Sequence, residues 1–182
     1  MAFPRRRGWV MAVSLLVSLG HSTMTLAATR PEKASPAPRI VLTPQRLAVL
    51  QQVNQHVNST IAEVSDLEQY GREDVWTLPL SGRGDCEDFA LLKRKLLAES
   101  GWPRSTLLVT AVQTGAGEPH AVLIVRTDKG DYALDSRTSA IRPLSATGYR
   151  ILSQQSQNSP GKWISAGTGE TTDVPVADFP VR

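Results

Sequence analysis

Three residues of this 182-residue sequence belong to side-chain types that together perform nucleophilic catalysis. Cys86 is the only cysteine, His120 begins an apolar stretch after a Gly- and Pro-containing loop, and Asp135 ends the next such stretch. A thiolate attacks a carbonyl carbon, an imidazole takes up and returns the proton, and a carboxylate holds the imidazole in the required tautomer. A lone cysteine is more often a buried small hydrophobic residue, but this order of residues favours a catalytic set. The other histidine beyond the N-terminal segment, His56, is expected at the surface.

Cys86 is expected in the first turn of a helix. Apolar residues recur at three- and four-residue steps after it, and Gly101 with Pro103 ends the pattern. Unpaired backbone N–H groups and the helix dipole favour an anion at a helix start, so they stabilise a thiolate at this position. The apolar stripe consists of Phe89, Leu92 and Leu96, and the more polar positions are Lys93, Arg94, Lys95 and Glu99.

The elements on either side of this helix predict a mixed α+β domain. The pair Thr43-Pro44 supplies a capping hydroxyl and a first-turn proline, which predict a helix over about 44–64. Stretches rich in Val, Leu and Ile predict strands downstream of the cysteine. They cover 106–113, 121–127 and 132–136, and 149–155 is a further short strand or helix.

The turn sequence at 128–131 predicts a hairpin between the second and third of these strands. A two-residue loop at Lys129-Gly130 would leave His120 four positions, about 13 Å, from the residue opposite Asp135. A catalytic contact requires instead a register centred two residues earlier, or a β-bulge. Hairpin arithmetic alone leaves the register open.

The segment 84–94, with the letters GDCEDFALLKR, resembles the family of bacterial transglutaminase-like cysteine peptidases. The resemblance extends to 119–123, with the letters PHAVL, and to Leu134-Asp135. It covers about residues 41–165 and implies a papain-like or transglutaminase-like α+β core. In such a core, a helix that carries the cysteine packs on an antiparallel sheet.

The resemblance also implies a role for each candidate residue. Cys86 is the nucleophile, His120 is the general base and then the general acid, and Asp135 is the orienting carboxylate. The implied activity is that of a cysteine endopeptidase with a thioester acyl-enzyme intermediate. The implied substrate is a periplasmic or cell-surface protein such as an adhesin, and the implied partner is a periplasmic regulator that sequesters the enzyme.

Three acids surround the nucleophile, namely Asp85, Glu87 and Asp88. One explanation is capping of the helix start by carboxylates. Clustered carboxylates also suit Ca²⁺, which prefers oxygen ligands, and the resemblance implies calcium bound by Asp85 and Glu87 with Asp88 as a helper. Bare carboxylates beside Cys86 would raise its pKa, and a bound cation would restore thiolate character.

Residues 1–27 have the organisation of an export signal. Arg5–Arg7 precede an apolar run of about eleven residues, and small residues around Ala27 form a plausible cleavage site. A membrane span needs about 20 apolar residues, so cleavage is expected rather than an uncleaved anchor. The sequence therefore predicts a periplasmic protein with no membrane span after signal cleavage.

Charge gives no support for nucleic-acid binding. The chain has 20 Lys and Arg against 17 Asp and Glu, but three of the basic residues lie in the acid-free segment 1–27. The remainder has 17 of each and no net charge, which is not the footprint of a nucleic-acid-binding protein. A single cysteine also excludes an internal disulfide and a multi-cysteine zinc site.

The predicted organisation is one catalytic domain with short flanking segments. A signal peptide at 1–27 and a flexible N-terminus at 28–40 precede the peptidase domain at 41–165, and a loose tail follows at 166–182. Two other functions remain open. One is a transglutaminase or deamidase that uses the same triad, since the sequence does not show whether water or an amine resolves the thioester. The other is a non-catalytic periplasmic binding module.

Overall fold

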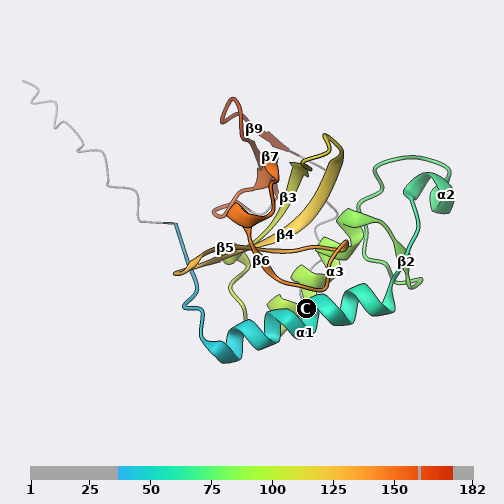
Figure 1. The fold of residues 1–182 in the computed structure, drawn as a ribbon. Helices are drawn as coiled ribbons and strands as arrows, with labels where there is room; N and C mark the ends of the chain where they lie inside the picture. The colour runs from blue at the N-terminus through green and yellow to red at the C-terminus, as the bar shows by residue number, and fades with distance from the viewer. Residues whose placement is uncertain (1–36, 160, 174–182) are drawn as a thin grey trace, which may run out of the picture. The chain divides into compact units, whose positions relative to one another are not determined.

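The computed structural model of the chain describes residues 37–159 and 161–173. In this part, the helices α1 (Pro44–Thr60) and α3 (Cys86–Glu99) lie together on one side of an antiparallel sheet (Figure 1). This arrangement confirms the predicted α+β class, with the cysteine-bearing helix packed on the sheet. The predicted signal segment 1–27 lies outside the described residues. No helix within the described ranges is long and apolar enough to cross a membrane.

The sheet is built around two long central strands. Its strands are β3 (Leu107–Gln113), β4 (Pro119–Thr127), β5 (Gly130–Leu134), β6 (Arg142–Pro143), β7 (Arg150–Gln155), β8 (Lys162–Ser165) and β9 (Thr171–Asp173). Outside this sheet lie β1 (Ala62–Glu63), α2 (Asp66–Tyr70), β2 (Arg83–Gly84) and the short 3₁₀ helices η1 (Arg104–Thr106) and η2 (Leu144–Ala146). The strand order in the described sheet is β6-β5-β4-β3-β7-β8-β9, and all neighbours are antiparallel. The short strands β1 and β2 pair with each other in parallel.

Side chains of the central strands alternate between two apolar clusters, one on each face of the sheet. Leu123 of β4 belongs to the main core, together with Leu50 of α1 and Leu97 of α3. Val122 belongs to a second cluster on the opposite face. Because successive residues of a strand point to opposite faces, His120 lies on the same face as Val122.

The predicted helix over 44–64 is confirmed at its start and ends four residues earlier than expected. Thr43 caps α1 by accepting a hydrogen bond from the Arg46 backbone N–H at 3.2 Å. At the other end, Ile61 adopts extended backbone angles, and β1 leaves to pair with β2. Pairing with a distant segment, which no local pattern encodes, thus shortens the helix.

Two asparagines of α1 hold the chain where it leaves β5. The Asn58 side-chain amide donates to the backbone carbonyls of Asp135 at 2.8 Å and Thr138 at 3.0 Å. One turn earlier, the buried Asn54 donates to the carbonyls of Thr138 at 2.9 Å and Ser139 at 3.1 Å. These bonds satisfy loop carbonyls that would otherwise lack partners. They fix the position at which Asp135 emerges from the sheet.

The hairpin between β4 and β5 has a register that the sequence did not predict. Thr127 pairs with Gly130, so Asp128-Lys129 forms the loop in place of Lys129-Gly130. The Asp128 backbone N–H donates to the Ile40 carbonyl at 2.9 Å, and its carboxylate accepts from the Leu42 N–H at 2.8 Å. Binding of this N-terminal segment withdraws Asp128 from the strand ladder and sets the register.

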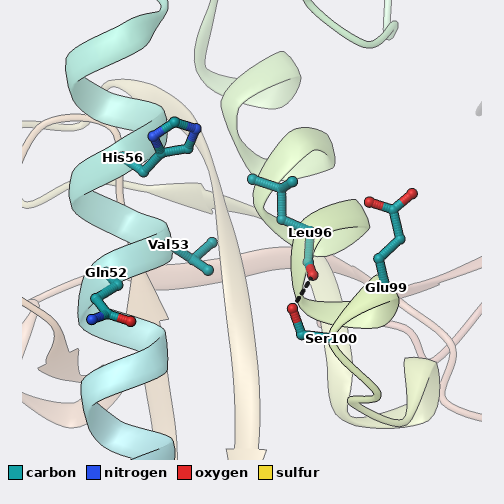
Figure 2. A pocket seen from close by; sticks show the side chains of 6 residues that line it. All are labelled: Gln52, Val53, His56, Leu96, Glu99 and Ser100. Carbon is teal, nitrogen blue, oxygen red and sulfur yellow. Dashed lines mark hydrogen bonds between the residues drawn. The ribbon is translucent and has the colours of Figure 1, made fainter.

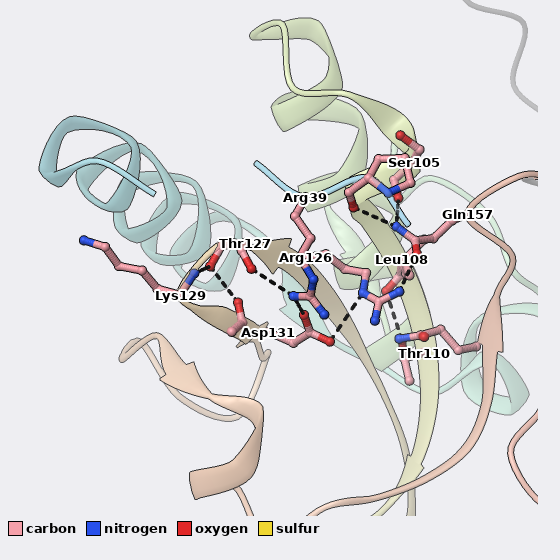
Figure 3. Close-up of polar contacts among 12 residues, drawn as sticks. Arg39, Ser105, Leu108, Thr110, Arg126, Thr127, Lys129, Asp131 and Gln157 are labelled. Atoms are coloured by element: carbon pink, nitrogen blue, oxygen red, sulfur yellow. Dashed lines mark hydrogen bonds and ion pairs between the residues drawn. The ribbon is translucent and has the colours of Figure 1, made fainter. Parts of the chain in front are cut away.

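The N-terminal segment is consequently fixed before the predicted boundary at residue 40. Arg39 donates to the Thr127 carbonyl and to the Asp131 carboxylate, both at 2.8 Å (Figure 3). The Gln157 amide donates to the Pro38 carbonyl at 3.0 Å. The flexible N-terminus predicted over 28–40 is therefore wrong at its C-terminal end, while 28–36 lie outside the described residues.

Part of the predicted C-terminal tail is paired in the sheet. Residues 166–182 were expected to be loose, but Thr171–Asp173 form β9, which pairs with β8. The turn between them is closed by the Gly169 N–H, which donates to the Ser165 carbonyl at 2.9 Å. A Gly- and Thr-rich composition conceals this short edge strand, because its pairing depends on β8. Residues 174–182 lie outside the described residues.

Lys93 is buried, although the sequence placed it among the polar positions of its helix. Its side chain is 0% exposed, and its Nζ has no hydrogen-bond partner. It lies over the Phe89 ring, with Nζ 5.7 Å from the ring centroid. Burial lowers the pKa of Lys93 to about 7, although the negative charge of Asp135 acts in the opposite direction and raises it. Burial of an ammonium group without a hydrogen-bonded partner destabilises a fold.

Replacing Lys93 with methionine is expected to stabilise the protein by about 1–4 kcal/mol near neutral pH, because an apolar chain of similar length fills the same space. Below about pH 7 the folded chain suffers the full cost of burying the charge. Between that pH and 10.5 the unfolded chain holds a proton that the folded chain lacks, so the cost shrinks as pH rises. Urea unfolding at about pH 6 and about pH 10 measures the gain at each end.

The matched control is Lys95→Met, on the exposed part of the same helix. It should change the free energy of unfolding by no more than about 0.5 kcal/mol. A loss of stability in Lys93→Met would show that contacts with Phe89 and Asp135 outweigh the burial of the charge. A gain that does not depend on pH would contradict the lowered pKa of Lys93 in the folded chain.

Candidate active site

His120 and Asp135 meet where two neighbouring strands end. His120 is the second residue of β4, Asp135 directly follows β5, and both side chains are buried. In the observed register, Leu123 pairs with Leu134, so Asp135 follows opposite Val122, only two positions from His120. Residues offset by two on adjacent strands share one face of the sheet. The His120 Nε2 atom lies 2.8 Å from Asp135 Oδ1.

Both oxygens of the Asp135 carboxylate accept hydrogen bonds. Oδ1 also accepts from the Arg137 backbone N–H at 3.0 Å, and Oδ2 accepts from the Tyr149 hydroxyl at 2.5 Å. Burial on its own raises the pKa of Asp135. The bonds from His120, Tyr149 and the Arg137 backbone outweigh it and lower the pKa to about 2. The carboxylate is therefore ionised at neutral pH.

An ionised Asp135 fixes the tautomer of His120. A carboxylate only accepts hydrogen bonds, so the proton of the neutral imidazole resides on Nε2. Nδ1 is then left as an acceptor, and it is buried with no hydrogen-bond partner. The arrangement can take a proton at Nδ1 and stabilise the resulting imidazolium through Asp135.

Cys86 is the first residue of α3, as predicted, but the surroundings of its thiol oppose ionisation. Its Sγ donates to Glu87 Oε2 at 3.2 Å. Burial first, and then the Glu87 charge, raise the pKa of the thiol to about 12. The Ala121 backbone N–H, which bonds to the sulfur, lowers it only in part. The expected stabilisation of the thiolate by the helix start is thus overridden, and the sulfur lies beside the residue that follows His120.

A group of three acids lies next to this thiol. Asp66, Asp85 and Glu87 each offer a carboxylate oxygen, and these oxygens lie within 4.8 Å of one another. Asp85 makes no side-chain cap hydrogen bond; its Oδ2 accepts from the Asp66 backbone N–H at 3.4 Å. The Oδ1 atoms of Asp66 and Asp85 are buried without hydrogen-bond partners. Burial, and then Glu87, raise the pKa of Asp85 to about 7.

Sequence reasoning named Asp88 for this cluster and missed Asp66. The Asp88 Oδ1 atom instead accepts from the Thr77 backbone N–H at 3.0 Å. Gly84 makes room for this carboxylate, because a Cβ at Gly84 would lie 2.5 Å from Asp88 Oδ2. Asp66 starts the short helix α2, about 20 residues before Cys86, and no spacing in the sequence links the two.

A hollow of about 350 Å³ lies between α1 and α3 (Figure 2). His56, which is exposed as predicted, faces it from α1. The hollow is lined by none of the three candidate catalytic residues and by none of the three acids clustered beside Cys86. Its lining consists of Gln52, Val53, His56, Leu96, Glu99 and Ser100.

Solved structures of a bacterial protein have a fold similar to that of this chain. The chain is similar to calcium-bound LapG of Legionella pneumophila, with a TM-score of 0.58 and 24% identity over 71% of this chain and 74% of that one. The EGTA-treated form of that protein gives a TM-score of 0.56 and 24% identity over 71% and 72%. A further LapG structure gives 0.50 and 27% over 58% and 62%. No curated protein matches the chain in sequence.

The sequence also matches a family model. The family is described as bacterial transglutaminase-like cysteine proteinase, and the match covers residues 24–171. This range includes the Cys86-bearing helix and the strands next to His120 and Asp135. The chain therefore belongs to the bacterial transglutaminase-like cysteine proteinase family and is a cysteine peptidase.

Proposed function

We propose that this peptidase is an exported, calcium-dependent endopeptidase that cleaves a periplasmic or cell-surface protein. Cys86 is the nucleophile, His120 the general base and then the acid, and Asp135 the orienting carboxylate. The observation that supports this assignment best is the 2.8 Å contact between His120 Nε2 and Asp135 Oδ1, which leaves Nδ1 unpartnered.

Acylation transfers one proton and breaks one bond. His120 Nδ1 takes the proton from Cys86 Sγ, and the sulfur attacks the carbonyl carbon of the scissile peptide. The carbonyl oxygen becomes an oxyanion, and unpaired N–H groups at the start of α3 can donate to it. The C–N bond then breaks, and His120 gives its proton to the leaving amine. The product is a thioester on Cys86.

Deacylation uses the same residues in reverse. His120 takes a proton from water, the resulting hydroxide attacks the thioester carbon, and the C–S bond breaks. The proton returns to the sulfur, and the carboxylic product leaves. Asp135 remains ionised in both half-reactions, because its pKa of about 2 lies far below neutral pH. Its charge stabilises the imidazolium that forms in each half-reaction.

The three acids next to Cys86 fit a calcium ion. Asp66, Asp85 and Glu87 supply clustered oxygens, and the Oδ1 atoms of Asp66 and Asp85 lack hydrogen-bond partners. Ca²⁺ takes six to eight oxygen ligands, so these residues would hold it together with other oxygens. A bound divalent cation supplies positive charge that offsets the carboxylates beside the thiol. LapG, which the chain resembles in fold, has been solved in calcium-bound and EGTA-treated forms, which supports this choice of metal.

Export and regulation complete the proposal. The segment 1–27 has the charged start and apolar run of a signal peptide. A protein with this signal meets its substrate in the periplasm or at the cell surface. A periplasmic regulator that sequesters the enzyme would control when the substrate is cleaved.

The catalytic assignment predicts loss of cleavage in three variants. Cys86→Ala and His120→Ala should abolish activity, and Asp135→Asn should lower kcat/KM by about 10²–10⁴-fold because the imidazole loses its fixed tautomer. Each variant is expressed in a deletion strain, and mass spectrometry compares new protein N-termini in the periplasm and medium with those of the wild type.

New N-termini that depend on all three residues support the endopeptidase. Crosslinked or deamidated glutamine in place of new N-termini would instead indicate the transglutaminase or deamidase reaction. Equal fragment patterns for the wild type and Cys86→Ala would contradict catalysis altogether.

The metal assignment predicts stabilisation by calcium. Added Ca²⁺ should raise the melting temperature of the wild type by mass action, and EGTA should reverse the rise. Asp66→Asn, Asp85→Asn and Glu87→Gln should each weaken the response, because each removes a charged ligand. Thermal unfolding over a range of calcium concentrations measures the shift.

Asp88→Asn is the control, because Asp88 is not one of the three clustered acids and its Oδ1 atom accepts from the Thr77 backbone N–H. This variant should keep the calcium response even where its baseline melting temperature falls. A wild type whose melting temperature and activity ignore both EGTA and added calcium would show that the proposed metal site is wrong.

A further inference from the structure

Tyr149 lies against the His120–Asp135 pair, although it belongs to none of the elements that carry the candidate residues. It sits between η2 and β7, directly after Gly148, whose φ of 74° turns the chain. The Tyr149 backbone N–H donates to Thr147 Oγ1 at 3.1 Å. The ring packs on the second apolar cluster, which lies on the face of the sheet that carries His120. Backbone and ring are thus both held in place.

Tyr149 contacts both members of the pair. Its hydroxyl donates to Asp135 Oδ2 at 2.5 Å. Its ring meets the His120 imidazole edge to face, with centroids 6.0 Å apart and planes at 73°. Burial, and then the neighbouring carboxylate, raise the pKa of Tyr149 to about 12. The hydroxyl therefore keeps its proton and remains a donor at neutral pH.

A carboxylate has little intrinsic preference for its terminal rotation, because χ2 of Asp is broad. His120 and the Arg137 backbone hold only Oδ1. The Tyr149 hydroxyl is the side-chain donor that holds Oδ2, and with both oxygens bound the carboxylate plane has a single orientation. That orientation directs Oδ1 at His120 Nε2 and keeps Nδ1 free.

We propose that Tyr149 is a positioning residue of this peptidase: its hydroxyl locks the Asp135 carboxylate and its ring limits rotation of the His120 imidazole. The inference rests on the proposed catalytic roles of Cys86, His120 and Asp135. Tyr149 itself touches neither the nucleophile nor the scissile bond. The hydroxyl acts through Asp135, so the effect of removing it must disappear where Asp135 cannot hold the imidazole.

The test uses Tyr149→Phe, which keeps the ring and removes only the hydroxyl. The readout is the rate at which iodoacetamide alkylates Cys86 in the folded, calcium-supplemented full chain, since this rate depends on proton removal by the imidazole. Tyr149→Phe should slow alkylation about tenfold, because misplaced catalytic groups lose much of their effect. Its melting temperature should stay close to that of the wild type.

Tyr132→Phe is the matched control, because Tyr132 packs against the main core on the other face of the sheet. It should leave the rate unchanged. In the Asp135→Asn background, Tyr149→Phe should add no further loss, whereas a merely structural role predicts the same loss in both backgrounds. The proposal would be overturned if Cys86 of Tyr149→Phe were alkylated at the wild-type rate. It would also be overturned if Tyr149→Phe slowed alkylation in the Asp135→Asn background as much as it does in the wild type.

His120→Ala separates this inference from the proposed function. If His120→Ala alkylates as fast as the wild type, the proposed base is wrong and the inference falls with it. If His120→Ala is slow and Tyr149→Phe is fast, the base stands and only the role of Tyr149 is lost.

Discussion

The hydrogen bond between His120 Nε2 and Asp135 Oδ1 is the contact on which the rest of the site depends. It forms because the β4–β5 hairpin places Thr127 opposite Gly130, whereas a loop at Lys129-Gly130 would put Asp135 opposite Ile124, four positions from His120. The N-terminal segment sets that register through Asp128, and the Asn58 amide holds the chain where Asp135 emerges. Elements distant in sequence therefore converge on one 2.8 Å contact, which fixes the imidazole tautomer.

Charge is the second constraint on this site. Burial and Glu87 raise the pKa of Cys86, and burial raises those of Asp85 and Asp88. Few buried positive charges balance these acids, since Lys93 is the only lysine or arginine in the described part of the chain that is fully buried. An excess of buried carboxylate beside a thiol disfavours the thiolate. The same excess suits a divalent cation, so nucleophile and acid cluster form one electrostatic unit.

Local patterns predicted the elements well and their long-range contacts poorly. The Cys86 helix, the central strands and the candidates His120 and Asp135 were read from periodicity, turn residues and a family resemblance. Asp66 was missed because α2 reaches the Cys86 helix only in the folded chain. Lys93 was placed on the polar side because periodicity cannot show which helix face the sheet covers. The hairpin register was left open for a similar reason, since Asp128 binds a segment some 86 residues away.

The tautomer of His120 tests the central claim most directly. Nitrogen NMR of the ¹⁵N-labelled full chain, at a pH where the imidazole is neutral, shows which ring nitrogen carries the proton. Our account predicts a proton on Nε2, hydrogen-bonded to Asp135, and an unprotonated Nδ1 that is ready to accept from Cys86. Asp135→Asn should mix the two tautomers. A neutral His120 with its proton on Nδ1 in the wild type would contradict the account, because that nitrogen could not take the proton of the thiol.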